Sequence, residues 1–419
     1  MKPTGTVGYA AMFEQFHPTD LLNWSKTAEE SGFGSVMASD HFHPWTPEQG
    51  QSAFVWSWMG ALGASTNLRF GTGVTPPGFR YHPAIIAQGA ATLEAMYPGR
   101  FWLGLGAGEA LNEHIVGDYW PEAPTRLRIL MEAIEVIRRL FTGKVVKYSG
   151  EHIKLESARL YTMPDTPPPI YVATAGPIQS RRTGEFCDGI ITVGAPDEKI
   201  KNLMEKFEEG ARRADKDPSE MPRMIQLHVS WAEDQEEAEQ QAVREWPNGG
   251  MPFPKADIRN PEDFAAMAKQ VTVENFQNRV LMSADLDEHL LRVDREFDVH
   301  AALLAATTGV DKLLRLGLLR SLRAACPERT GGSRRVRLVQ RHVARCCAGE
   351  DRVQLEVGRR VVWPAVAPVS VEVRSGHRLR RRVGGLREGP RHRCRPGRCP
   401  RRTVGGRRSP SASGSAPRR

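Results

Sequence analysis

Short apolar runs alternate with longer amphipathic stretches through the first two thirds of the chain. A run of four to eight apolar residues between turn residues is typical of a buried strand, whereas apolar positions at i, i+3, i+4 and i+7 are typical of a helix. The stretch 126–142 has the clearest helical period, because Leu127, Leu130, Ile134 and Ile137 fall on one face. The chain therefore reads as repeated strand–helix units.

These units are numerous enough to indicate a fold. The predicted strands cover 6–10, 35–38, 69–74, 101–105, 169–173, 189–193 and 224–230. The predicted helices cover 18–32, 52–66, 82–96, 126–142 and 197–215, and a hairpin is predicted to be inserted over 144–161. Seven βα-type units in about 230 residues favour a (β/α)8 TIM barrel over an open sheet. No Gly-x-Gly-x-x-Gly opens a helix after the first strand, which argues against a dinucleotide-binding fold.

The eighth unit is incomplete in this pattern. A helix predicted from residue 283 should lead to a final strand near residue 305, but Ala-Leu repeats follow, and then Arg-, Gly-, Ser- and Pro-rich sequence. We therefore expect a barrel domain over 1–290, with its last βα unit replaced by a tail over 291–419 that is disordered or frameshifted. A barrel without its eighth strand would leave two edges of unpaired N–H and C=O groups. The change in composition favours a frameshift between about residues 288 and 310.

Charge separates the same two parts. Residues 291–419 contain 31 Lys+Arg and 10 Asp+Glu, a net charge of +21, whereas residues 1–290 carry −12. Arg-rich segments bind phosphate backbones, so nucleic-acid binding is an alternative function if the tail is exposed. Trp363 is the only aromatic residue beyond position 300, so base stacking by the tail has little support.

Cysteine usage bears on location. Five of the six cysteines lie in the tail, and only Cys187 lies within 1–290, so the barrel part shows no disulfide framework. No basic segment followed by an apolar one opens the chain as a signal peptide would. No apolar run reaches the ~18 residues of a membrane span. We therefore expect a cytoplasmic protein.

Two polar clusters directly follow predicted strands, over 39–45 and 106–113. In barrel enzymes the loops at the carboxyl ends of the strands carry the chemistry. The first cluster contains Asp40, His41 and Trp45, and an imidazole with a pKa near ~6.5 suits acid/base work at neutral pH. The clusters therefore predict an enzyme.

Together with the motifs at 57–59, 79–84 and 175–177, these clusters resemble the coenzyme F420-dependent branch of the luciferase-like barrel family. Within it they are most similar to the F420-dependent glucose-6-phosphate dehydrogenase group, from about residue 5 to about residue 289. The resemblance implies a luciferase-like barrel that transfers hydride from an alcohol or sugar phosphate to the deazaflavin coenzyme F420. It also implies a homodimer.

The resemblance assigns roles to individual residues. His41 and Glu109 would be the acid/base pair, and Trp45 would lie near the hydroxyl being oxidised. The residues that would hold the cofactor are Asp40, Gly73, Val74, Ala107, Gly108, Asn112, Ala175 and Gly176. Among these, Gly73–Val74 would form a cis peptide behind the ring, and Ala175–Gly176 would meet the cofactor phosphate. Lys255 and Arg279 would face an anionic group of the substrate. No metal site is predicted.

Three positions differ from the family pattern. Pro76 replaces a threonine that touches the deazaflavin, and Val193 and Pro196 replace a threonine and a lysine of the substrate phosphate site. The substrate therefore stays open between glucose 6-phosphate and another alcohol or anionic compound. Two further hypotheses also stay open, namely an FMN-dependent monooxygenase of the same fold and a gene product without activity.

Each assigned residue also has a structural explanation. His41 follows a strand, where polar side chains often serve only to form hydrogen bonds within the protein. The carboxylate of Glu109 could simply be stabilised by the dipole at the N-terminus of a helix. Trp45 could be a core residue, and Lys255 and Arg279 could be surface cations.

Overall fold

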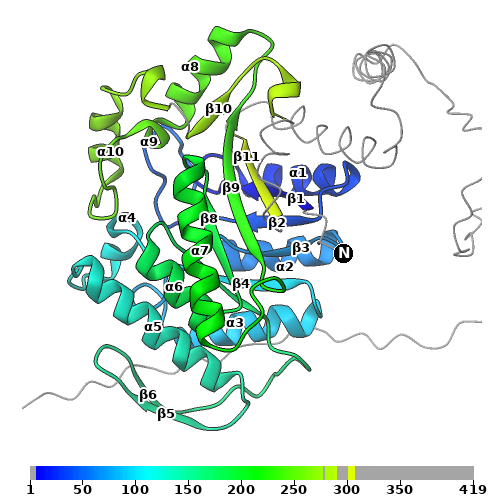
Figure 1. Ribbon diagram of the computed structural model, residues 1–419, viewed down its shortest axis with the longest axis vertical. Helices are drawn as coiled ribbons and strands as arrows, with labels where there is room; N and C mark the ends of the chain where they lie inside the picture. Colours follow the sequence, from blue (N-terminus) through cyan, green and yellow to red (C-terminus); the bar gives the residue numbers. More distant parts are fainter. Residues whose placement is uncertain (1–5, 277–278, 290–300, 307–419) are drawn as a thin grey trace, which may run out of the picture. The chain divides into compact units, whose positions relative to one another are not determined.

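The computed structural model describes residues 6–276, 279–289 and 301–306, all within a compact unit that spans Met1–Arg335 (Figure 1). Apart from 301–306, the predicted tail over 291–419 lies outside the described residues. The nucleic-acid binding considered for that tail lies outside them as well.

Eight parallel strands pair in a closed ring, which confirms the predicted (β/α)8 barrel. In chain order they are β1 (Thr6–Ala11), β2 (Ser35–Ala38), β3 (Arg69–Thr72), β4 (Phe101–Leu105), β7 (Ile170–Ala173), β8 (Gly189–Val193), β9 (Arg223–Ser230) and β11 (Ala301–Ala306). Each strand pairs with the next, and β11 returns to pair with β1. All seven strands predicted from the apolar runs are present.

The last strand corrects an expectation. β11 lies between β9 and β1, with Ala301 opposite both Met224 and Thr6. The Ala-Leu run thus forms the eighth strand that we expected the tail to replace, and the barrel extends past the predicted boundary at 290. A parallel strand enclosed on both faces needs a continuous apolar run rather than an alternating one. Alanine is depleted in strands, so this run resembles a helix or a linker in sequence.

Helices cover the outside of the ring (Figure 1). They are α1 (Pro18–Glu30), α2 (Val55–Ser65), α3 (Pro83–Met96), α5 (Ala123–Leu140), α6 (Pro177–Phe186), α7 (Asp197–Arg213) and α8 (Gln235–Glu245). α1 and α3 begin alike: the rings of His17 and His82 accept hydrogen bonds from the backbone N–H groups of Thr19 and Ala84, each of which follows a first-turn proline. These two histidines are therefore helix caps. None of the helices in the described part of the chain is long and apolar enough to cross a membrane.

Further elements lie at the two ends of the barrel. The antiparallel hairpin β5 (Val146–Ser149) and β6 (Lys154–Ala158) lies at the bottom of Figure 1 and confirms the predicted insertion. The elements between β9 and β11 gather at the top with α8: α9 (Pro247–Gly250), α10 (Pro261–Ala268), η2 (Val273–Phe276) and β10 (Val280–Met282). The loop after β4 holds α4 (Ala110–Glu113) and η1 (His114–Val116).

Apolar side chains form two large clusters. Trp102 and Tyr171 are almost fully buried, with ring centroids 6.2 Å apart, and they pack with Met37 and other strand residues. Leu103, the neighbour of Trp102, belongs instead to the cluster that includes Ile137 of α5. Alternate side chains of a barrel strand point into the barrel and out to the helices. The first cluster therefore fills the inside of the barrel and extends to α8, α10 and η2, and the second joins the sheet to its helices.

Candidate active site

A pocket of about 600 Å³ opens where the strands end. Its wall contains every predicted site residue except Gly176, which lies at the N-cap of α6. The predicted residues in the wall are Asp40, His41, Trp45, Gly73, Val74, Ala107, Gly108, Glu109, Asn112, Ala175, Lys255 and Arg279. The carboxyl ends of barrel strands meet on one face, so residues far apart in sequence converge there.

His41 is held by contacts to both of its ring nitrogens. Nε2 lies 3.3 Å from Oε1 of Glu14. Nδ1 lies 3.2 Å from Nδ2 of Asn112 and 3.2 Å from the carbonyl oxygen of His43. The Asn112 amide can donate to an unprotonated Nδ1, whereas the His43 carbonyl can accept from a protonated one. The surroundings of His41 therefore suit both the neutral and the charged imidazole, as an acid/base group requires.

Glu14 was missed in the sequence analysis. It is buried, 2% exposed, and its Oε2 accepts a 2.6 Å hydrogen bond from Oγ of Ser39. Ser39 in turn accepts a 2.9 Å hydrogen bond from the backbone N–H of Phe13. Glu14 follows β1 closely, so the rule that polar residues after strands carry chemistry would have found it. It stands alone after an apolar run rather than in a cluster, which is why it was not recognised.

Glu109 lines the same pocket as His41. Burial raises the pKa of its carboxyl, against the lowering influence of His41 and Lys255. None of the described residues donates a hydrogen bond to this carboxylate. A carboxyl group with a raised pKa and no protein donor is available to exchange a proton with a ligand.

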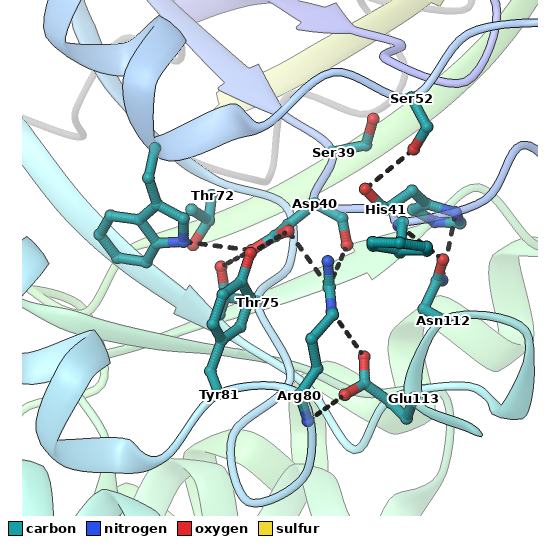
Figure 2. Close-up of polar contacts among 12 residues, drawn as sticks. Ser39, Asp40, His41, Ser52, Thr72, Thr75, Arg80, Tyr81, Asn112 and Glu113 are labelled. Atoms are coloured by element: carbon teal, nitrogen blue, oxygen red, sulfur yellow. Dashed lines mark hydrogen bonds and ion pairs between the residues drawn. The ribbon is translucent and has the colours of Figure 1, made fainter. Parts of the chain in front are cut away.

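The carboxylate of Asp40 is engaged inside the protein (Figure 2). Oδ2 accepts from Thr75 Oγ1 at 2.6 Å and from Trp56 Nε1 at 3.3 Å, and Oδ1 lies 3.3 Å from the Tyr81 hydroxyl and 3.1 Å from Arg80 Nη2. A carboxylate offers about four acceptor positions. All are in use, so the predicted direct contact of Asp40 with a cofactor would require one of these donors to leave.

Arg80, which the sequence analysis did not single out, joins Asp40 to Glu113 (Figure 2). Its Nε lies 3.3 Å from Oε1 of Glu113, and its backbone N–H donates a 3.0 Å hydrogen bond to Oε2. Burial raises the pKa of Glu113 to about 7, although Arg80 opposes the rise. Burial also disfavours the charge on Arg80, but the two carboxylates outweigh it and raise its pKa.

Asn112 is another predicted cofactor ligand whose polar atoms contact the protein. Its Oδ1 accepts hydrogen bonds from the backbone N–H groups of Phe42 at 2.9 Å and His43 at 3.2 Å. Its Nδ2 faces His41. In this structure Asn112 therefore connects the loop after β4 to the loop after β2.

The glycine-containing loops form another part of the wall. The peptide bond between Gly73 and Val74 is cis, as the resemblance implied. Gly108 has a φ of +77°, and a Cβ at this position would lie 2.9 Å from Cβ of Pro76. Only glycine allows this backbone to approach so closely. Pro76, which replaces the family's threonine, therefore meets the loop that carries Glu109.

The N-terminus of α6 bounds the far side of the pocket. Gly176 is the N-cap, and Oγ1 of the neighbouring Thr174 donates a 3.1 Å hydrogen bond to its carbonyl oxygen. Helix N-termini present N–H groups that suit phosphate. Val193 is half exposed in the wall, and Pro196 is the N-cap of α7. These two positions offer no cation to a substrate phosphate.

Lys255 and Arg279 both reach the pocket. Lys255 Nζ donates a 2.6 Å hydrogen bond to the carbonyl oxygen of Asn248, and burial lowers its pKa. Arg279 is exposed, and its Nη1 donates a 3.0 Å hydrogen bond to the carbonyl oxygen of Met251. Each cation retains further donors, so this end of the pocket suits an anionic group.

Trp45 is a buried wall residue rather than only a core residue. Its ring lies 5.1 Å from that of His41 and 5.2 Å from that of Phe264. Its Nε1 is buried and has no acceptor among the described residues. A buried indole N–H usually finds a partner, so the unpaired N–H of Trp45 is unusual for a buried tryptophan.

Two further wall residues carry polar atoms that the sequence did not indicate. Oδ1 of Asn248 is buried, also without a partner within the described chain. The His228 ring stacks on Trp246 at 5.1 Å, and burial, helped by the charge of Lys255, lowers the pKa of His228 to about 4. His228 is therefore neutral at physiological pH. It lies inside a regular strand and Asn248 in a short helix, so neither had a sequence motif.

Comparison with known proteins shows the family to which this barrel belongs. Residues 3–299 match the family described as luciferase-like monooxygenase, which is most of the chain. The chain belongs to this family.

Similar curated proteins have a narrower description. An F420-dependent glucose-6-phosphate dehydrogenase of Microbacterium testaceum is 38% identical over 296 residues, covering 70% of this chain and 88% of the relative. A protein of the same name from Nakamurella multipartita is 37% identical over 296 residues, covering 70% and 87%.

Solved structures with the same fold include F420-dependent enzymes. An F420-dependent secondary alcohol dehydrogenase in complex with an F420–acetone adduct has a TM-score of 0.71 and 35% identity, covering 75% of this chain and 97% of that one. The F420-dependent tetrahydromethanopterin reductase of Methanopyrus kandleri, at 20% identity and a TM-score of 0.61, shares the fold.

Proposed function

We propose that this protein is an F420-dependent dehydrogenase that takes hydride from a hydroxyl-bearing substrate. The observation that carries the proposal is the environment of His41, which lies in the pocket wall between Glu14 and Asn112 and shares that pocket with Glu109. The relatives named as F420-dependent dehydrogenases support the choice of cofactor.

The residues of the pocket fit the reaction. An unprotonated ring nitrogen of His41, whose ring lies in the pocket wall, removes the hydroxyl proton. As the C–H bond breaks, its electron pair leaves with the hydride and the carbon becomes a carbonyl. The deazaflavin, when bound, would supply the acceptor for that hydride. Glu109, whose pKa burial raises, supplies the proton that balances the added negative charge.

Other residues bind and orient. We infer that the cis peptide at Gly73–Val74 and the backbone at Ala107–Gly108 support the deazaflavin ring, and that the N-terminus of α6 at Ala175–Gly176 meets its phosphate. Asp40 and Asn112 then act mainly by holding loops in place. Lys255 and Arg279 bind an anionic group of the substrate.

Cofactor binding tests the proposal. Purified full-length protein is titrated with oxidised F420 and, separately, with FMN, and fluorescence is followed. We expect saturable quenching with F420 only. Preference for FMN would instead favour an FMN-dependent monooxygenase, and binding of neither cofactor by folded protein would overturn both functions.

Activity tests the role of His41. His41→Asn is expected to lower kcat for F420 reduction by roughly 100- to 10,000-fold. His17→Asn is the matched control, because His17 is an exposed helix cap outside the pocket lining and asparagine is also a good cap. Equal loss in both variants would contradict a role of His41 in catalysis.

We also infer a homodimer and a cytoplasmic location. Ile85 and Met96 are 59% and 57% exposed on α3, eleven residues apart and so on one helix face. Such an apolar face suits association of two copies of the chain. Light scattering on the wild type and on Ile85→Lys would test this: we expect a dimeric wild type and a weakened dimer in the variant, and a monomeric wild type would count against the dimer. The location rests on cysteine usage and remains a prediction.

A further inference from the structure

The two groups proposed for acid/base work come from different loops. His41 lies in the loop after β2, and Glu109 in the loop after β4. Arg80 comes from a third segment, between β3 and α3, and contacts both loops (Figure 2). Its Nη2 lies 3.1 Å from Oδ1 of Asp40 and donates a 3.0 Å hydrogen bond to the Asp40 carbonyl oxygen. Its Nε lies 3.3 Å from Glu113.

This contact set is buried. The Arg80 side chain is 8% exposed, and the side chains of Asp40 and Glu113 are 1% and 0% exposed. Charged groups removed from water interact more strongly than at a surface, and the planar guanidinium can address two carboxylates at once. Arg80 also lies over the ring of Tyr81 at 4.6 Å. The position of the guanidinium is therefore fixed from several sides.

The anchor points lie next to the reacting groups. Asp40 immediately precedes His41 in the chain. Glu113 immediately follows Asn112, whose amide contacts the His41 ring and the backbone of its loop. Glu109 starts the same short helix that Glu113 ends, because α4 spans Ala110–Glu113 with Glu109 as its N-cap. A shift at either end of Arg80 would thus change the separation of His41 and Glu109.

We propose that Arg80 is a positioning residue that sets the relative placement of His41 and Glu109 by joining Asp40 to Glu113. It acts through these two carboxylates and is not itself in the pocket wall. The proposal rests on the function proposed above. It assigns to Arg80, which lies outside the pocket lining, a role in fixing the geometry of the two acid/base groups.

Two variants test it, Arg80→Met and Arg80→Lys. Methionine keeps much of the length and removes every donor, whereas lysine keeps the charge but cannot bridge both carboxylates as a fork. A misplacement of about 1 Å can cost on the order of 100-fold in rate. We expect kcat to fall about 100-fold in Arg80→Met and less in Arg80→Lys. The Kd for F420 and the KM for substrate should change less than about threefold in Arg80→Lys.

The matched control is Arg139→Met. Arg139 is a half-exposed arginine of α5 that pairs with Glu135, and the change should leave kcat, KM and the F420 Kd as in the wild type. Folding is checked by the thermal midpoint of each variant. If Arg80→Met does not fold, Arg80→Lys decides the question.

The outcomes are distinct. Loss of kcat with retained F420 binding in a folded variant supports the proposal. Unchanged kcat in a folded Arg80 variant overturns it, and so does a parallel loss of kcat, F420 binding and thermal midpoint, which would indicate a purely structural role. Failure of the wild type to reduce F420 with any alcohol or sugar phosphate would overturn the proposed function itself. This result is distinct from failure of the Arg80 proposal, because it is measured on the wild type and not on the variants.

Discussion

The two sides of the pocket differ in how far their polar groups are satisfied by the protein. The network wall, which consists of Asp40 and Asn112 in the pocket lining with Arg80 and Glu113 behind them, has partners for its charged and amide groups. The open wall, made of His228, Trp246, Asn248 and Lys255, includes a buried carboxamide oxygen without a partner in the described residues, a neutral imidazole and a cation with spare donors.

This difference separates two tasks. Groups that already have their hydrogen bonds need no rearrangement when a ligand arrives, so the network wall is preorganised for the reaction. An unpaired buried acceptor costs free energy until a ligand pairs with it. We therefore expect the open wall to contribute to substrate selection and the network wall to hold the loops of His41 and Glu109 in place. It also follows that family resemblance in the network wall says little about which alcohol is oxidised.

The largest effect is expected from breaking the ring on which both walls are mounted. A chain ending at residue 290 lacks β11, so β1 and β9 lose a shared neighbour and expose unpaired backbone groups. We expect it to be insoluble or unfolded and unable to bind F420. A chain ending at residue 335, the limit of the compact unit, should keep the circular dichroism and F420 binding of the full protein. A folded, F420-binding chain ending at 290 would contradict the assignment of β11.

A smaller effect is expected from the buried charge of the network wall. The pKa of Glu113 is raised from 4.5 to about 7, so the folded state holds this proton more tightly than the unfolded state. The contribution of Glu113 to the free energy of unfolding is therefore largest below about pH 4.5. It is lost as pH rises to about 7, by roughly 3 kcal/mol.

Glu113→Gln removes this titration. Urea unfolding at several pH values should show a smaller decrease in stability between pH 5 and pH 8 for the variant than for the wild type. The difference between the two curves isolates Glu113, because other groups titrate in both proteins. Parallel curves would show that Glu113 has an ordinary pKa in the folded state.

The smallest effect is expected from a substitution that tests whether the open wall selects the substrate. Asn248→Leu replaces the unpaired carboxamide with an apolar group of similar size. We expect kcat/KM for a polyhydroxylated or anionic alcohol to fall about tenfold, while simple secondary alcohols are affected less, because an apolar substrate does not satisfy Oδ1. The F420 Kd should stay constant. Asn23→Leu on the exposed face of α1 is the matched control. Equal effects on both substrate classes would argue against a role of Asn248 in selection.

Regular periodicity made most of the fold predictable. Seven strands and the main helices were found because each has a run or face that a short window of sequence displays. The site residues in the clusters at 39–45 and 106–113 were found for the same reason, because each cluster is contiguous. Glu14, His228 and Asn248 were missed because each stands apart from such a cluster, so only the closed ring brings them to the pocket. Arg80 lies in the motif at 79–84 but was given no role, because its contacts with Asp40 and Glu113 form only in the folded chain.

The sequence by itself determined the barrel class and the loops that carry chemistry, since these depend on local composition and order, and the family resemblance implied the acid/base candidates. The tertiary structure decided three other matters. It made 301–306 the eighth strand, because pairing depends on what neighbouring strands offer. It showed that the polar atoms of Asp40 and Asn112 are engaged within the protein, and it linked Arg80 to both loops. Hydrogen-bond partners distant in sequence are fixed only when the chain closes on itself.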